Sequence, residues 1–250
     1  MKELLRHCLR LIVTVLLRLR SKPLAVPAGS RCVIIAPHQD DESLGCAGLI
    51  VTRRAAGLPV HVVYVTDGAG SHPNHPRLRP TDIARLRRAE AIVAMQKLGV
   101  AESALHFLDA PDGTLTHLDP DAFENLAAGL AAQLASLQPT ELFLPCSDDT
   151  SSEHTGAFSL TIRALKIAGL TPRIFEYPVW ARWRPQVLFR VGLRSRIVWR
   201  LFFPGSVTLK RAALSAYISQ SEPTPPWSEP VLPRGFIGCF DSAEEFFFER

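Results

Sequence analysis

The 250-residue sequence contains few cysteines, and none of them is paired in a Cys-x-x-Cys motif. The five cysteines are Cys8, Cys32, Cys46, Cys146 and Cys239. An odd number of unpaired cysteines predicts buried or free thiols in a reducing compartment, and it argues against a zinc site built from thiolates. Internal repeats and low-complexity tracts are also missing, and 47% of the residues are apolar. Length and composition therefore predict one enzyme-sized domain with a full hydrophobic core.

Long apolar runs are missing as well. The longest mostly apolar stretch, Leu11–Leu17, is much shorter than the roughly 20 residues that span a bilayer. No small-residue cleavage site follows it. We therefore expect neither a membrane-spanning helix nor a signal peptide, and we expect a cytoplasmic protein.

Residues 1–22 nevertheless show an amphipathic helical pattern with six basic residues and one acidic residue. On a helical wheel, Val13 and Leu17 are the apolar exceptions on a polar side that carries Lys2, Glu3, Arg6, His7, Arg10 and Thr14. The opposite side carries Leu4, Leu5, Cys8, Leu9, Leu11, Ile12, Val15, Leu16 and Leu19. Such a helix either lies peripherally on the inner face of the membrane or packs on the core of the protein itself.

Positive charge is concentrated in two parts of the chain. The formal net charge of +4 comes from 28 basic and 24 acidic residues. Residues 182–211 contain eight basic residues and no acidic residue, and residues 1–22 contain six more basic residues. The remainder holds 14 basic and 23 acidic residues. No recognised nucleic-acid-binding motif accompanies these basic segments, so we do not predict a nucleic-acid partner.

Short aliphatic runs alternate with helical patterns. The predicted strands are Val33–Ala36, Val60–Thr66, Leu105–Leu108 and Glu141–Pro145. The predicted helices are Leu44–Ala56, Thr81–Leu98, Pro120–Leu137 and Thr155–Ala168. This alternation predicts an α/β protein, a three-layer α/β/α fold with a mostly parallel, Rossmann-like sheet. Ligands bind beyond the carboxyl ends of such strands. The polar residues expected there are His38, Asp67, Asp109, Asp112 and those of the loop 146–154.

A histidine and two aspartates directly follow the first predicted strand. Pro37 ends this strand, so His38, Asp40 and Asp41 can converge on one point. Imidazole and carboxylate groups together favour a divalent metal ion such as zinc. Because a catalytic zinc keeps three protein ligands, one aspartate would remain as a general base for the attacking water. The alternative is a solvated acidic loop at the end of a strand.

Residues Pro37–Gly48 read Pro-His-Gln-Asp-Asp-Glu-Ser-Leu-Gly-Cys-Ala-Gly. They resemble the Ala-His-Pro-Asp-Asp-Glu-x-Leu-Gly-Cys-Gly-Gly signature of the PIG-L/LmbE family of zinc-dependent N-acetylglucosaminyl deacetylases, with departures at Pro37, Gln39 and Ala47. The segments that follow in family order are Val62–Gly68, Arg87–Glu90 and Phe107–Gly113. The resemblance is close over residues 31–180 and looser beyond them.

The resemblance implies a role for several residues. Zinc, or another divalent metal ion, is expected to bind His38, Asp41 and His154. Catalytic roles are expected for Asp40 as the general base and for Arg87 beside the substrate. Contacts with the substrate are expected at Ser151. From their place after predicted strands, Asp67 and Asp112 are further candidates for such contacts, and the alternative is that these aspartates only cap turns.

The chain departs from the family at two positions in the loop before His154. Ser151 and Glu153 stand where the family motif His-x-Asp-His has its first histidine and its aspartate. The resemblance assigns to that histidine a part in stabilising the tetrahedral intermediate. Loss of one such donor typically costs about two to three orders of magnitude in turnover. The three expected metal ligands are unaffected.

The amphipathic pattern predicts an N-terminal helix over residues 1–25, and the resemblance implies a deacetylase domain over residues 26–250, with the part from about 181 matched less closely. The expected reaction is removal of acetyl from an N-acetylated amino sugar similar to N-acetylglucosamine, free or in a glycoconjugate carried on a lipid or phosphate anchor. The alternative is a weakly catalytic or non-catalytic relative that binds glycan or lipid at the membrane surface.

Overall fold

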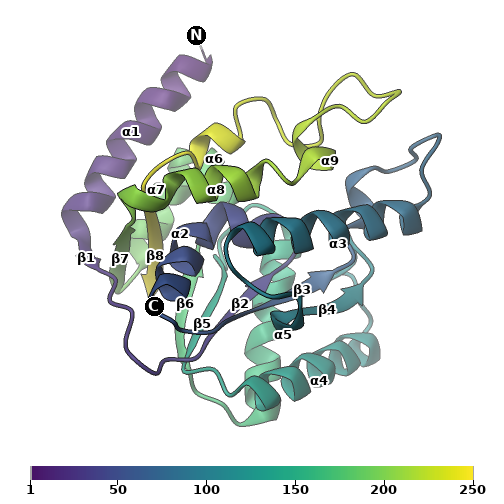
Figure 1. The fold of residues 1–250 in the computed structure, drawn as a ribbon, viewed down its shortest axis with the longest axis horizontal. Helices are drawn as coiled ribbons and strands as arrows, with labels where there is room; N and C mark the ends of the chain where they lie inside the picture. Colours follow the sequence, from purple (N-terminus) through teal and green to yellow (C-terminus); the bar gives the residue numbers. More distant parts are fainter. Residues whose placement is uncertain (1, 250) are drawn as a thin grey trace.

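The computed structural model describes residues 2–249, with side chains from Leu5 onward. Lys2, Glu3 and Leu4, which the helical wheel assigned to its two sides, therefore have side chains outside the described residues. The strands form one sheet in the order β1-β7-β8-β6-β5-β2-β3-β4 (Figure 1). They are β1 (Ser21–Pro23), β2 (Cys32–Ala36), β3 (Val60–Thr66), β4 (Leu105–Ala110), β5 (Glu141–Pro145), β6 (Arg173–Tyr177), β7 (Ile197–Phe202) and β8 (Glu244–Glu249). Within this sheet β8 alone is antiparallel to its neighbours.

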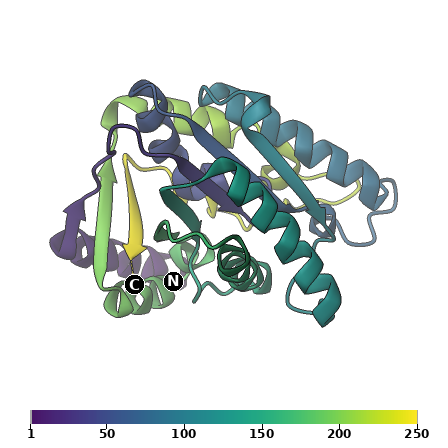
Figure 2. The ribbon, with the colours of Figure 1, turned by 90° about the horizontal axis from the view of Figure 1, so that it is seen from below.

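Helices cover both faces of the sheet, which confirms the predicted three-layer fold. The α-helices are α1 (Lys2–Arg20), α2 (Asp41–Ala55), α3 (Pro80–Lys97), α4 (Pro120–Leu137), α5 (Ser152–Ala168), α6 (Trp180–Trp183), α7 (Pro185–Arg194), α8 (Val207–Leu214) and α9 (Ile218–Ser221). Short 3-10 turns are η1 (Ala69–Ser71), η2 (Glu102–Ala104), η3 (Pro204–Ser206) and η4 (Ile237–Cys239). Figure 2 shows α2, α3 and α8 on one face, with α4, α5, α7 and α1 on the other.

The N-terminal helix is shorter than expected. It ends at Arg20, not near residue 25, because Ser21–Pro23 pairs with β7 as an edge strand of the sheet. None of the helices within residues 2–249 is both long enough and apolar enough to cross a membrane.

The order of the strands creates a crevice beside β2. From β2 the chain adds β3 and β4 on one side, and then crosses to add β5 and β6 on the other. The loops after β2 and β5 therefore diverge at a topological switch point, where ligands bind in open α/β sheets. The sequence places His38 and the loop 146–154 at these two strand ends.

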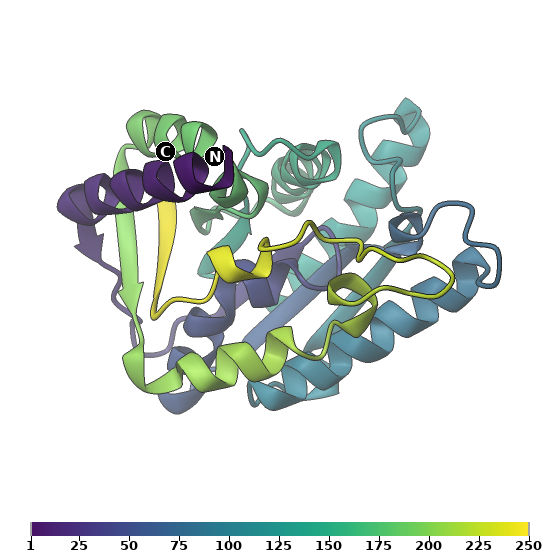
Figure 3. The ribbon, with the colours of Figure 1, turned by 90° about the horizontal axis from the view of Figure 1, so that it is seen from above.

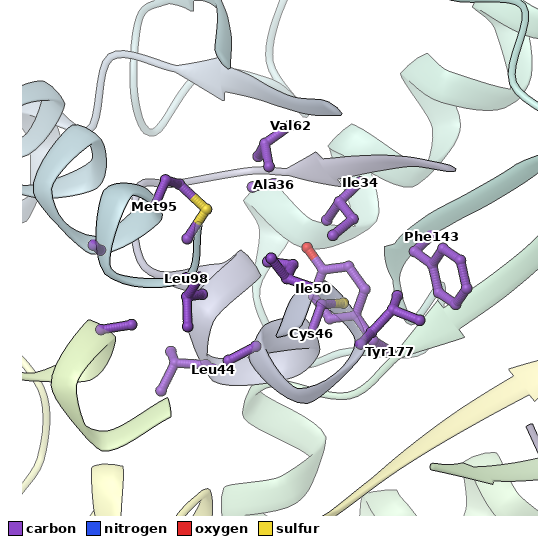
Figure 4. Packing of buried hydrophobic residues seen from close by; sticks show 14 of the residues in the cluster. Ile34, Ala36, Leu44, Cys46, Ile50, Val62, Met95, Leu98, Phe143 and Tyr177 are labelled. Atoms are coloured by element: carbon purple, nitrogen blue, oxygen red, sulfur yellow. The ribbon is translucent and has the colours of Figure 1, made fainter. Parts of the chain in front are cut away.

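Helix α2 packs very closely on the sheet. A Cβ atom on Gly45 would lie 2.3 Å from Cδ2 of Tyr177, and the hydroxyl of Tyr177 donates to the carbonyl of Ile35 at 2.7 Å. Glycine is therefore required at this contact. Figure 4 shows the core formed there by Ile34, Ala36, Val62, Phe143 and Tyr177 of the sheet with Leu44, Cys46, Ile50, Met95 and Leu98.

A buried ion pair fixes the first turns of α2. The ammonium of Lys210 lies 2.8 Å from Glu245 and also donates to the carbonyl of Leu44. The carboxylate of Glu245 accepts from the backbone N–H groups of Gly48 and Leu49. Both charged side chains are nearly inaccessible, so each depends on the other for charge compensation. The pair ties the helix that begins at Asp41 to α8 and β8.

Candidate metal centre and active site

Three predicted ligands converge where β2, α2 and α5 meet. His38 follows β2, Asp41 is the first residue of α2, and His154 lies in the first turn of α5. Their ligand atoms all lie within 4.8 Å of one another. Asp41 is central, because its Oδ2 lies 3.2 Å from Nδ1 of His38 and its Oδ1 lies 3.3 Å from Nε2 of His154.

Asp149 orients His154 from behind. Its Oδ2 lies 3.0 Å from Nδ1 of His154, and both side chains are fully buried. The same carboxylate accepts from the backbone N–H groups of Val179, Trp180 and Ala181. A carboxylate on the far nitrogen of an imidazole is the usual partner of a histidine that binds metal, because it fixes the tautomer and leaves Nε2 as the ligand atom.

The donor set fits a divalent metal ion. Nε2 of His154 is buried and has no hydrogen-bond partner within the described residues. Although burial lowers the pKa of His154, Asp41 and Asp149 outweigh it and raise this pKa to about 10. Burial also lowers the pKa of His38, but Asp112 and Asp41 outweigh this effect and raise the pKa to about 9. The carboxylates thus create a strongly negative site that attracts positive charge, and nitrogen and oxygen donors of this kind suit zinc.

Asp40 stands beside the donor set in a strained backbone conformation. Its φ of 146° lies in a region that L-residues rarely adopt, at a cost of about 1–3 kcal/mol. The guanidinium of Arg87 lies 3.4 Å from Oδ1 of Asp40 and donates to the carbonyl of Gln39 at 2.6 Å. Burial raises the pKa of Asp40 to about 7, although Arg87 opposes the shift. A carboxyl group with this pKa can accept and release a proton near neutral pH.

Two further carboxylates, those of Asp112 and Glu153, lie beside His38. Asp112 Oδ1 lies 3.0 Å from Nε2 of His38, and Glu153 completes a further set of ligand atoms within 4.8 Å. Glu153 accepts from the backbone N–H of Leu115, whereas its Oε2 is buried without a hydrogen-bond partner in the described part of the chain. This side of the site is therefore also rich in oxygen donors.

A cavity of about 470 Å³ opens above these residues. Its polar floor includes His38, Asp40, Asp41, Arg87, Asp112 and Glu153. Its upper walls include Leu44, Gly70, Ser71, Ser151, Trp180, Arg184, Gln220, Leu232 and Phe236. The mixed lining offers both apolar faces and hydrogen-bonding groups to a small ligand.

The structure brings most of the predicted site residues to this cavity. His38, Asp40, Asp41, Arg87, Asp112 and Ser151 line it, and His154 is buried directly beneath. Arg87 is almost fully buried, so it is not part of a solvated helix face.

Two of the expected aspartates lie outside the cavity wall. Asp67 accepts from the backbone N–H groups of Ala69 and Asp112, so it holds the loop that presents Asp112. Its predicted contact with substrate stays a prediction. Asp109 does not join the cluster, because its carboxylate pairs with Arg88 at the surface.

Three residues of the site were given no role from the sequence. Asp149, behind His154, was noted only as part of a loop, and Arg184 and Gln220, which line the cavity, were not assigned to it. Asp149 could have been found from the rule that a metal-binding histidine bonds a carboxylate. Sequence spacing gave no such signal for Arg184 or Gln220, since distant loops bring them to the cavity.

The comparisons with known proteins agree with this geometry. The PIG-L family model, described as GlcNAc-PI de-N-acetylase, matches residues 33–165, more than half of the chain. No curated protein sequence matches the chain.

Solved structures share the fold at low sequence identity. A triple mutant of a deacetylase of the teicoplanin biosynthetic pathway is 19% identical, with 88% of this chain and 97% of that chain covered and a TM-score of 0.67. The N,N'-diacetylchitobiose deacetylase of Pyrococcus horikoshii is 21% identical, with coverages of 87% and 78% and a TM-score of 0.57. The 4-carboxy-2-hydroxymuconate hydratase GalB of Pseudomonas putida is 18% identical, with coverages of 77% and 80% and a TM-score of 0.61. The same fold thus occurs in structures of deacetylases and of a hydratase.

Proposed function

Because the chain belongs to the PIG-L family of de-N-acetylases, we propose that it removes acetyl from an N-acetylated amino sugar. We propose that the reaction depends on one divalent metal ion and that this ion is zinc. The protein is an N-deacetylase, a hydrolase of linear amide bonds. The sugar, its carrier and the metal are the parts that we propose. A ring similar to N-acetylglucosamine fits the cavity, and the carrier would be a lipid or a phosphate-bearing group.

One observation supports this function most directly. Nε2 of His154 is buried and faces Oδ1 of Asp41 at 3.3 Å, Asp149 orients the ring, and no residue in the described part of the chain forms a hydrogen bond with Nε2. A polar atom in that state costs free energy unless a ligand satisfies it. We propose that His38, Asp41 and His154 hold the metal ion and that Asp40 remains free to act as a base.

The residues of the chain suggest how the reaction proceeds. When bound, a divalent ion would supply Lewis acidity that activates water and polarises the acetamide carbonyl. Asp40 accepts the proton of the attacking water and returns a proton to the departing amine. Arg87 keeps Asp40 in place from the side, and its positive charge limits the rise in the pKa of that carboxyl. The walls formed by Trp180 and Phe236 hold the sugar and exclude bulk water.

The substitution at Ser151 favours a second candidate function. Ser151 lines the cavity at the start of α5, where the family has a histidine. Without that imidazole the oxyanion would lose one donor, which typically costs about two to three orders of magnitude in turnover. The chain would then be a weakly catalytic or non-catalytic protein that binds the same glycan or its lipid. Binding of substrate without acetate release would identify this case.

Acetate release across a panel of substrates tests the proposal. We expect zinc-supplemented protein to release acetate from at least one N-acetylated sugar, nucleotide sugar or lipid-linked sugar. The reaction should stop when a chelator removes the metal and resume when zinc is restored, because the metal activates the water. Rates unaffected by chelation would contradict the metal-dependent mechanism, and no release from any class would favour the binding alternative.

Asp149→Asn is expected to weaken metal binding by about 10–100-fold, the usual effect of altering the carboxylate that orients a metal-binding histidine. The amide keeps the volume of Asp149 but reduces the negative charge at Nδ1 of His154. Titration with zinc in a competing chelator would measure the affinity. Asp148→Asn is the matched control, because the neighbouring carboxylate instead pairs with Arg194. Equal affinities for the two variants would remove Asp149 from the metal centre.

A further inference from the structure

Helix α1 packs on the domain through its basic side. The guanidinium of Arg6 lies over the ring of Trp183 at 4.3 Å from the ring centroid. Three more arginines each bind a different part of the domain: Arg10 donates to Sγ of Cys239, Arg18 to the carboxylate of Glu244 and Arg20 to the carbonyl of Gly192. Contacts to separate elements fix the rotation of the helix about its axis.

The apolar residues that anchor α1 are the two exceptions on its polar side. Val13 and Leu17 are 2% and 3% exposed and belong to the core cluster beneath α7. A Cβ atom on Gly192 of α7 would lie 2.5 Å from Leu17, so the two helices are in close contact there. Figure 3 shows α1 and α7 side by side. From the main apolar side of α1, Leu9 also packs against this cluster, half-buried, while most of that side takes no part in the packing.

The main apolar side of α1 is turned to the outside. Leu5, Leu11, Ile12, Val15, Leu16 and Leu19 are 40% to 79% exposed. At 3.6 residues per turn these side chains fall within an arc of about 140°. Of the two alternatives for this helix, packing of its main apolar side on the core is therefore not what the structure shows for Leu5, Ile12 and Leu16. An unburied face of this width is unusual for a helix on a soluble domain, which normally turns such a face to the core.

Helix α7 extends this surface. Its Leu188 and Val191 point into the core and its Gly192 faces α1, which leaves Phe189 and Leu193 on the outer side, 39% and 55% exposed. We call these two residues and the six exposed residues of α1 the apolar face. Exposed apolar surfaces of this size mark sites of interaction with proteins or membranes.

The two segments that form the apolar face carry charge of one sign, and the nearby carboxylates of Glu244 and Asp148 are each paired with an arginine of these segments. Residues 5–23 and 182–211, which include the whole face, contain no aspartate or glutamate. Lys22, Arg190 and Arg196 are exposed and form no ion pair within the described residues. A second copy of the chain docked through this face would bring two basic rims together, and like charges oppose such an interface. An anionic lipid surface complements both the apolar residues and the basic rim.

We propose that the apolar face, with its basic rim, docks the protein on the surface of an anionic lipid bilayer. Helix α1 then lies in the interface with its apolar side inserted among the lipids, while Arg10, Arg18 and Arg20 keep the domain attached to it. The docking depends only on this surface and does not rest on the proposed deacetylase function.

Docking through the apolar face would place the cavity close to the membrane. The benefit for a lipid-linked substrate rests on the proposed function. A groove of about 540 Å³ separates α1 from α6 and α7, lined by Leu5, Leu9 and Ile12 on one side and by Trp183, Arg184 and Pro185 on the other. Arg184 also lines the catalytic cavity. A sugar carried on a lipid anchor could thus reach the cavity without its anchor leaving the membrane.

Co-sedimentation with vesicles tests the docking. We expect the full chain to sediment with vesicles of phosphatidylcholine and phosphatidylglycerol, and much less with phosphatidylcholine alone or at high salt, which screens the basic rim. Ile12→Glu with Leu19→Glu should lower the bound fraction about tenfold or more, since it removes apolar area and adds negative charge. Val93→Glu with Ile167→Glu is the matched control, because both residues are similarly exposed on α3 and α5.

Thermal melts and acetate release from a soluble substrate accompany the binding measurement. Both pairs are exposed, so both variants should melt and react like the original protein. Ile12→Ser with Leu19→Ser repeats the comparison without added charge if the glutamates disturb folding. Failure of the original protein to sediment, or equal sedimentation of the α1 and control variants, would overturn the proposal. A dimer that Ile12→Glu with Leu19→Glu converts to monomer, with no vesicle binding, would also overturn it and assign the face to self-association.

Discussion

His154→Ala is expected to leave the protein folded but without its metal ion and without measurable deacetylation. The imidazole is completely buried between Asp41 and Asp149, so its removal leaves two of three expected protein ligands and a hole that water can enter. Because loss of an orienting carboxylate alone typically costs about 10–100-fold in metal affinity, loss of the ligand should cost more.

Elemental analysis after exposure to equimolar zinc measures this effect, and a thermal melt reports whether the chain is folded. His117→Ala is the control, because His117 is exposed and makes no side-chain hydrogen bond within residues 2–249. A full equivalent of tightly bound zinc in His154→Ala would exclude His154 as a ligand.

Asp40→Asn should keep the metal ion and lose about 10²–10⁴-fold in turnover, the range that a positioned general base contributes. Asparagine preserves the volume of Asp40 and tolerates its positive φ comparatively well, but its amide cannot take the proton of the attacking water. Turnover at saturating substrate and metal content together separate this effect from damage to the metal site.

Asp109→Asn provides a closely matched control for this variant. Asp109 also has a positive φ, of 53°, and it pairs with Arg88, the neighbour of Arg87 in sequence. It lies outside the cavity, so we expect turnover to be retained. Undiminished hydrolysis by Asp40→Asn would mean that another group is the base. Glu153 would be the next to test, because its Oε2 is buried and has no hydrogen-bond partner among the residues that the structure describes.

Periodicity predicted the strongly patterned elements well. The bounds of β3, β5 and α4 agree with the prediction, because turn residues limit each of them on both sides. Helix α2 starts three residues earlier than predicted, since Asp41 and Glu42 looked like loop residues although acidic groups are favourable in the first turn of a helix. Strand β8 escaped prediction because its three phenylalanines are buried on both faces and do not alternate with polar residues.

The site was predictable to the extent that it lies in one continuous motif. His38, Asp40 and Asp41 are neighbours in the sequence, so their convergence with a metal ion could be inferred from local chain geometry. The role of Asp149 depends on a turn that brings it back onto His154, and that of Arg184 on the packing of α6 against the cavity. Tertiary structure determines such contacts, and no periodic pattern in the sequence predicts them.

The orientation of α1 shows a further limit. The helical wheel separated its two sides, yet it did not tell which of them faces the domain. Two apolar residues on the basic side, Val13 and Leu17, together with arginine contacts to distant loops, decide the orientation. An amphipathic pattern therefore defines the faces of a helix, whereas the side that is buried depends on the shape and charge of what it meets.

The place of β8 in the sheet has a consequence for biosynthesis. This strand comes last in the sequence described, yet it lies between β6 and β7, and β1 joins the sheet only through β7. While the ribosome is still making residues 178–243, β6 is an open edge that invites pairing with other chains, and we expect chaperones to protect it. Glu245, which accepts from the backbone N–H groups of Gly48 and Leu49 in α2, arrives in the same final step. The packing of α2 between the sheet and α8 is therefore expected to be complete only after translation has passed β8.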